Sequence, residues 1–360
     1  MRLLSHAALF VGLTVAPVMA SAQSLSDLAG SDKPLVLQKQ GSVFVGGRTI
    51  KTEDAGWGNM EPVFGESFEA GNVLVDQMYV QFQVPVGATH TPIVFMHGGL
   101  LSSKQWETTP DGRMGWFEHF TRQGFPTYMA EQSGRARSGF NGSIFNQVSR
   151  GKVPPSKQPR VYLGTSDMAW KMFRFGPEEG EAYPGQQFPL EHVQELYKQI
   201  IPDMFETQVP SLLNELGSPT TNNPTVENVA ELASKLDGAI LVGHSQSAGF
   251  PTQAVLKEKG GIKGLIQLET GCFSNLTPQQ VELLAKIPIL FMVGDYLGQN
   301  PSASCDKEIE QIKAAGGDIT FVSLPEAGLH GNTHMFMQDK NNIEVANLII
   351  KWIDEHVESR

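Results

Sequence analysis

Short apolar runs that alternate with helical patterns constrain this chain more than any other feature. The runs are PIVFMHGG (92–99), AILV (239–242), IKGLIQLE (262–269) and IPILFMVGD (287–295). Apolar runs of this length are typical of strands that are buried on both faces of a parallel sheet. Since amphipathic helices such as TVENVAELASKL (225–236) separate them, the pattern predicts an α/β fold. We expect a mostly parallel central sheet with helices on both faces.

Further elements complete this pattern at both ends of the chain. The expected strands lie at 35–50, 77–85, in the first part of 126–138, and at 318–325, and the expected helices at 247–259, 306–317 and 341–357. Residues 139–222 interrupt the alternation, because they are rich in proline, glycine and aromatic residues. We interpret them as a cap insertion within one domain, since the strand–helix pattern resumes after them.

Composition and charge limit the classes of partner. The 360 residues are 40% hydrophobic and 18% charged, as in a globular protein with a sizeable core, and the net charge is −11. Nucleic acids and anionic membranes favour basic surfaces, so neither is expected as a partner.

The N-terminus has the pattern of a secretory signal peptide. Arg2 precedes an apolar stretch, and Ala20-Ser21-Ala22 resembles a cleavage site. We therefore expect a signal peptide at 1–22, a mature domain at 23–360, and a periplasmic or secreted protein. Elsewhere, no segment is long and apolar enough to predict a stable membrane anchor.

Cysteine usage agrees with export. Cys272 and Cys305 are the two cysteines of the chain, and an even pair in an exported protein predicts a disulfide. Since they lack the close spacing of metal-binding cysteines, we expect no structural metal. No cofactor is expected either.

The stretch GHSQS (243–247) carries the strongest chemical signal. A buried strand, Gly-x-Ser-x-small and then a helix is the context of a nucleophile elbow, in which a tight turn exposes the serine. Ser245 is the predicted nucleophile, although Ser247 stands where glycine is usual. A serine hydroxyl is a poor nucleophile, so it needs a base.

His97-Gly98-Gly99 ends an earlier buried strand, from which this architecture takes an oxyanion donor. We assign the oxyanion hole to the backbone N–H groups of Gly99 and Gln246. His97 itself is expected to brace its loop rather than to react.

The residues alone leave the acid and the base open. Glu269 and Asp295 each end a strand after the elbow, and either can orient an imidazole. His330 and His334 both lie between the last strand and the last helix, where the base should be found.

Longer motifs carry a family resemblance. They are GHSQSAG, WETTPDGRMGW, QSGRARS, FRFGP, NPTVENV and HGNTHMFMQDKNN. With these motifs the chain resembles a small group of exported bacterial serine esterases on the α/β-hydrolase fold, which have a Ser-Glu-His triad. The resemblance implies Ser245 as nucleophile, Glu269 as acid and His334 as base, which leaves Asp295 and His330 as the alternatives.

The resulting prediction is an exported serine carboxylesterase that acts on a small-molecule ester through an acyl-enzyme. A lactonase or acyltransferase on the same triad is the alternative, and a non-catalytic binding protein is a third. Four aromatic residues fit either a substrate pocket or the core of the cap. They are Trp106, which precedes the insertion, and Trp170, Phe173 and Phe175 within it. A homodimer is left open.

Overall fold

The computed structural model describes residues 33–58, 61–204, 222–269, 271–298, 302–303 and 305–359. The predicted signal peptide at 1–22 and part of the predicted cap insertion, 205–221, lie outside these residues.

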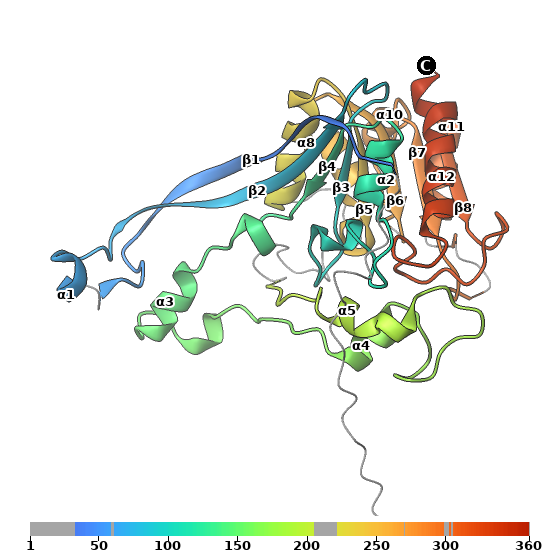
Figure 1. The fold of residues 1–360 in the computed structure, drawn as a ribbon. Helices are drawn as coiled ribbons and strands as arrows, with labels where there is room; N and C mark the ends of the chain where they lie inside the picture. Colours follow the sequence, from blue (N-terminus) through green and yellow to red (C-terminus); the bar gives the residue numbers. More distant parts are fainter. Residues whose placement is uncertain are drawn as a thin grey trace, which may run out of the picture.

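One eight-stranded sheet organises the chain (Figure 1), in the order β1-β2-β4-β3-β5-β6-β7-β8. The strands are β1 (Leu37–Thr52), β2 (Gly71–Pro85), β3 (Ile93–Met96), β4 (Thr127–Ala130), β5 (Ala239–His244), β6 (Ile262–Leu268), β7 (Ile289–Val293) and β8 (Ile319–Ser323). Neighbours from β4 to β8 pair in parallel, whereas β1 with β2 and β2 with β4 pair antiparallel. The predicted mostly parallel sheet is confirmed.

The helices expected over 225–236, 306–317 and 341–357 lie close to where the sequence predicts them, the helix expected over 247–259 differs, and the other helices were not predicted. The helices are α1 (Glu61–Phe64), α2 (Trp116–Arg122), α3 (Ser143–Ser149), α4 (Ser166–Met172), α5 (Val193–Tyr197), α8 (Pro224–Lys235), α9 (Phe250–Val255), α10 (Pro278–Leu284), α11 (Asp306–Ala314) and α12 (Asn342–Ile353). The helix expected over 247–259 is wrong at both ends. A 3-10 turn, η7 (Ser245–Ser247), comes first, and α9 then starts with Pro251 in its first turn. Proline suits that position because its missing N–H has no partner in the first turn of a helix.

Helices cover both faces of the sheet. Successive residues of each strand point to opposite sides, so each strand contributes side chains to two apolar cores. On β3, Ile93 and Phe95 join the core of α2 and α12, while Val94 and Met96 join that of α8 and α9. Helices α10 and α11 pack over the second face beside β6 and β7. This two-sided burial explains why the parallel strands are apolar without alternation.

Strands β1 and β2 form a long ribbon that extends away from the sheet (Figure 1, blue). Its far end contacts the inserted segment near α3, where Asn146 Nδ2 donates to the Asp54 carbonyl at 2.7 Å. Many side chains of the ribbon are exposed, including Phe44 and Leu74. The ribbon thus departs from the compact strand–helix layers of the rest of the chain.

The described part of the inserted segment adds no strand to the central sheet. Its helices α4 and α5 lie together beneath the sheet in Figure 1. Trp170, Phe175 and Phe188 are buried in the same apolar cluster as Phe95 and Trp116. The segment therefore shares the main core rather than building a separate one.

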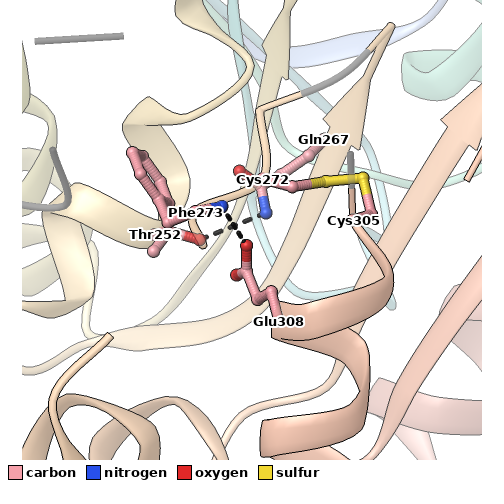
Figure 2. Close-up of a disulfide and its surroundings, with 6 residues drawn as sticks. All are labelled: Thr252, Gln267, Cys272, Phe273, Cys305 and Glu308. Atoms are coloured by element: carbon pink, nitrogen blue, oxygen red, sulfur yellow. Dashed lines mark hydrogen bonds between the residues drawn. A yellow bond between two sulfur atoms is a disulfide. The ribbon is translucent and has the colours of Figure 1, made fainter. Parts of the chain in front are cut away.

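A disulfide joins Cys272, in the loop after β6, to Cys305 at the start of α11, which is the predicted pairing (Figure 2). Beside it, Glu308 Oε2 accepts a hydrogen bond of 2.5 Å from the backbone N–H of Phe273. The loop after β6 is therefore attached to α11 twice, once covalently and once through a buried carboxyl group.

Among the described residues, no helix combines the length and apolarity that a membrane crossing needs.

Burial of Glu308 predicts a pH-dependent stability. The desolvation of this side chain raises its pKa from 4.5 to about 7. The unfolded chain thus releases this proton at lower pH than the folded protein does. The resulting stabilisation is complete below pH 4.5 and is lost as the pH rises to about 7. We expect Glu308→Gln to gain about 2–3 kcal/mol relative to the wild type between pH 4.5 and pH 8.

Urea unfolding at several pH values measures this difference. Glu310→Gln is the matched control, because Glu310 is exposed on the same helix. Parallel stability curves for the wild type and Glu308→Gln would contradict the interpretation.

Candidate active site

Ser245 lies on a tight turn at the end of β5. Its φ of 56° is left-handed, which is uncommon for a non-glycine residue. The turn is this tight only because Gly243 lacks a side chain: a Cβ there would lie 2.1 Å from the Ser247 carbonyl oxygen. The strand–turn–helix context that the sequence predicts is therefore present, and Ser245 is partly exposed on it.

Ser247, which stands where glycine is usual, is built into the turn. Its Oγ accepts from the His244 N–H at 3.0 Å and lies 3.1 Å from the Met96 carbonyl, to which it donates. The hydroxyl thus links the ends of β5 and β3. Its burial costs little because its hydrogen bonds are made.

His334 lies between Ser245 and Glu269. Its Nε2 is 2.8 Å from Ser245 Oγ, and its Nδ1 is 2.8 Å from Glu269 Oε2. With the ring proton assigned to Nδ1, His334 donates to the carboxylate and accepts from the hydroxyl. An imidazole in this position can take the serine proton, and the carboxylate stabilises the cation that forms.

The other histidine of the same loop, His330, is exposed. The structure therefore brings His334, and not His330, together with Ser245.

Glu269 follows β6 with a φ of 64° and is buried. Its Oε1 accepts from the Gly294 N–H at 2.7 Å, and its Oε2 lies 2.6 Å from Arg174 Nη1. Burial alone would raise the pKa of Glu269, but the charge of Arg174 and the hydrogen bond from His334 outweigh it. The pKa therefore lies well below its usual range.

Asp295, the other candidate acid, bonds to the backbone of the loop that carries His334. Its Oδ2 accepts from the Asn332 N–H at 2.9 Å, and its own N–H donates to the Asn332 carbonyl at 2.7 Å. Partial burial raises its pKa. Asp295 thus fixes the loop, whereas Glu269 contacts the imidazole.

Asp339 anchors the same loop from within. It accepts from the Thr333 N–H at 2.7 Å and from the Thr333 hydroxyl at 2.8 Å. Burial raises the pKa of Asp339 to about 7. The residue before His334 is therefore held at two atoms.

The loop after β3 approaches Ser245 closely. A Cβ on Gly98 would lie 3.2 Å from that of Ser245. The N–H of Gly98 donates to Gln105 Oε1 at 3.0 Å, and that of Leu100 to Asp203 Oδ2 at 3.1 Å. Between them, the N–H of Gly99 has no acceptor in the described part of the chain.

Gln246 and His97 are held from neighbouring segments. The side-chain oxygen of Gln246 accepts from Gln132 Nε2 and Arg135 Nη1, both at 3.0 Å. His97 is fully buried and accepts at Nε2 from the Gln132 N–H at 3.0 Å, so it braces the loop as expected. Burial lowers the pKa of His97 to about 3, which keeps it neutral.

The four aromatic residues predicted for a pocket or a cap core are all buried in one apolar cluster: Trp106, Trp170, Phe173 and Phe175. The ring of Trp106 packs on those of Phe95, Trp116 and His244. Phe173 differs from the others, because its ring stacks on His334 with centroids 5.9 Å apart.

Two residues near Ser245 were not expected from sequence reasoning. His244 Nε2 lies 2.9 Å from the His334 carbonyl, and burial lowers the pKa of His244 to about 3. Arg174 contacts both Glu269 and His334. The motifs GHSQSAG and FRFGP contain these residues, so the motifs were a signal, but nothing local pointed to their contacts.

No family model matches the chain. A solved structure described as a novel bacterial esterase is 41% identical, with a TM-score of 0.81, and the match covers 91% of this chain and 98% of that one. The chain belongs to the family of this bacterial esterase. A probable secreted lipase, phiG, from a fungal species (strain ATCC 74256) is 23% identical over 331 residues, which are 77% of this chain and 86% of the lipase.

Membership of this bacterial esterase family identifies the chain as a carboxylic ester hydrolase on the α/β-hydrolase fold. Among the described residues, no three histidine, cysteine or acidic side chains cluster as metal ligands would.

The turn at Ser245–Ser247 depends on Gly243. Gly243→Ala is therefore expected to lower the free energy of unfolding by about 3 kcal/mol, which is the upper end of the usual cost of overpacking. The clash is with backbone atoms, which cannot move away cheaply. Denaturant unfolding and ester turnover check this expectation.

Gly71→Ala is the matched control, because a Cβ there would meet nothing within 4 Å. A Gly243→Ala protein with wild-type stability would show that the turn tolerates a side chain.

Proposed function

We propose that the chain is an exported serine carboxylesterase in which Ser245 is the nucleophile, His334 the base and Glu269 the acid. The observation that carries the proposal is the continuous pair of 2.8 Å contacts from Ser245 Oγ through His334 to Glu269 Oε2. Members of a triad are recognised by this geometry rather than by their sequence positions.

Acylation follows from these contacts. Ser245 Oγ attacks the ester carbonyl carbon while its proton passes to His334 Nε2. The negative charge of Glu269 stabilises the imidazolium, and the tetrahedral intermediate then expels the alcohol, which takes the proton from Nε2.

In deacylation, water is the nucleophile and Ser245 is the leaving group. A water molecule gives its proton to His334 Nε2 and attacks the acyl carbon. The intermediate collapses, the carboxylic acid leaves, and the proton returns to Ser245 Oγ.

The N–H groups of Gly99 and Gln246 are the proposed oxyanion donors. Support for Gly99 comes from its neighbours, since the N–H groups of Gly98 and Leu100 already have acceptors. A donor without an internal acceptor is available when negative charge develops on the substrate oxygen.

Export is the second part of the proposal. It is supported by the signal-peptide pattern at 1–22, by the disulfide between Cys272 and Cys305, and by the relationship to a probable secreted lipase. Disulfides persist in the periplasm and outside the cell.

Residues 139–222 are the proposed cap, and a small-molecule carboxylic ester is the proposed substrate class.

A panel of 4-nitrophenyl esters with short to long acyl chains tests the nucleophile. Ser245→Ala is expected to lower kcat by about 10⁴-fold or more, and an organophosphonate should label the wild type at Ser245.

Ser42→Ala is the control, because Ser42 is exposed on β1. Turnover that survives Ser245→Ala, or labelling at another residue, would refute the proposed nucleophile.

The acid and the base are tested by two matched pairs of variants on the ester that is turned over fastest. Glu269→Gln should lower kcat by about 10⁴-fold, as the loss of a triad carboxylate does, whereas Asp295→Asn should retain most activity. Likewise, His334→Ala should abolish turnover and His330→Ala should not, because His330 is exposed. The reverse order within either pair would reassign that role.

A further inference from the structure

We propose that Arg174, from the inserted segment, is a positioning residue for the reaction. Its guanidinium holds the Glu269 carboxylate against His334 and keeps this carboxylate charged. The inference rests on the function proposed above, because it concerns the same acid and base.

The contacts of Glu269 fix its carboxylate in one orientation. Arg174 Nη1 lies 2.6 Å from Oε2, the oxygen that also receives the hydrogen bond from His334 Nδ1. The Gly294 N–H binds Oε1 on the other side. Rotation of the carboxylate would break one or more of these contacts, so Oε2 stays in line with the imidazole.

Burial makes a cation next to this carboxylate necessary. The Glu269 side chain is 1% exposed and that of Arg174 is 13% exposed, so solvent screens their interaction little. Desolvation favours the neutral carboxyl group, and the Arg174 charge is the largest effect that opposes it and lowers the pKa of Glu269. A neutral carboxyl group could not stabilise an imidazolium.

Arg174 also lies close enough to act on the imidazole itself. Its Nη1 is 3.3 Å from His334 Nδ1. The same positive charge favours the ionised form of Glu269, so the carboxylate keeps accepting the hydrogen bond from Nδ1. The carboxylate is therefore charged when the imidazole takes the serine proton at Nε2.

The backbone around Arg174 supports a dedicated role. Arg174 has a φ of 60°, a left-handed conformation that costs energy for a residue with a side chain. The preceding residue, Phe173, accepts a 3.0 Å hydrogen bond at its carbonyl from the N–H of His334. Strained residues persist where the surrounding structure determines their conformation, and they cluster at functional sites.

Other titratable groups surround the pair. Apart from Arg174, they are His244 on β5, Asp295 after β7, and Asp339 on the loop of His334. Burial lowers the pKa of His244 to about 3, so it is uncharged near neutral pH. Burial raises the pKa of Asp339 to about 7, so its titration needs its own control.

The test compares Arg174→Gly and Arg174→Lys. Glycine suits a φ of 60°, so the first variant removes the side chain without adding backbone strain. The acid limb is the fall of kcat/KM at low pH. Because loss of the Arg174 charge favours the protonated form of Glu269, we expect this limb to move to higher pH by about one unit or more in Arg174→Gly. We expect kcat/KM at pH 7 to fall about 10- to 100-fold, by analogy with partners that orient metal ligands. Arg174→Lys keeps the charge, so its acid limb should stay close to that of the wild type.

A double-mutant cycle with Glu269→Gln separates positioning from a structural role. If Arg174 acts through Glu269, then Arg174→Gly should have little further effect on kcat/KM in the Glu269→Gln background. An equal loss in both backgrounds, or an acid limb that does not move in Arg174→Gly, would overturn the proposal.

Two controls complete the design. Lys171→Met removes an exposed positive charge from the same segment and should leave the profile unchanged. The shift caused by Arg174→Gly should persist in the Asp339→Asn background; its disappearance there would assign the limb to Asp339 and overturn the proposal.

The parent hypothesis is tested separately on the same ester. Turnover that survives Ser245→Ala would refute the proposed function. Loss of turnover in Ser245→Ala, combined with a wild-type profile in Arg174→Gly, would refute the role of Arg174 alone.

Discussion

The buried negative charge of Glu269 is the constraint on which the arrangement around Ser245 depends. A carboxylate without solvent must be compensated by donors or cations, or it becomes protonated. Here the compensating groups come from three distant parts of the chain: Gly294 after β7, His334 before α12, and Arg174 in the inserted segment. The parallel register of β6 and β7, with Leu268 opposite Met292, brings the first of them within reach. One carboxylate therefore links the sheet, the histidine loop and the insertion.

Unusual backbone conformations gather at the same edge of the sheet. Leu100 follows β3, Ser245 follows β5, Glu269 follows β6 and Tyr296 follows β7, and all four have φ between 56° and 66°. Ligands of open α/β sheets bind outside the carboxyl ends of the strands. Left-handed conformations let the chain turn sharply there, so that polar groups face the site instead of continuing the strand. The energetic cost is borne by the apolar core that fixes these strands on both faces.

Sequence patterns were sufficient for the sheet and for the turn, because both depend on local periodicity and small residues. The continuous apolar runs correspond to β3, β5, β6 and β7, and Gly243 meets a steric demand that no other residue can. The start of α9 was misplaced because the turn at Ser245–Ser247 uses residues that would also fit a helix. Helix α10 was missed, although Thr277 and Gln280 form a capping box that a closer search would have found.

The choice within each candidate pair was beyond local reasoning. His330 and His334 are four residues apart in one loop, and only the tertiary structure determines which of them faces Ser245. Glu269 and Asp295 end neighbouring strands, and the difference is that Glu269 turns inward while Asp295 bonds to the backbone at Asn332. Their proposed roles remain predictions. Arg174 belongs to the FRFGP motif, but nothing local indicates its partners, which are 95 and 160 positions further along the chain.

The attachment of Phe173 and Arg174 to His334 and Glu269 bears on how this fold can diversify. Insertions in α/β hydrolases are natural places to exchange one specificity for another, because loops tolerate change better than the sheet does. In this chain, an exchange of the whole segment would also remove the contacts that Phe173 and Arg174 make with His334 and Glu269. Recombination and protein engineering should therefore succeed when the crossover points leave Phe173 and Arg174 with the scaffold. An exchange of the insertion would, to that extent, also change the surroundings of Glu269 and His334.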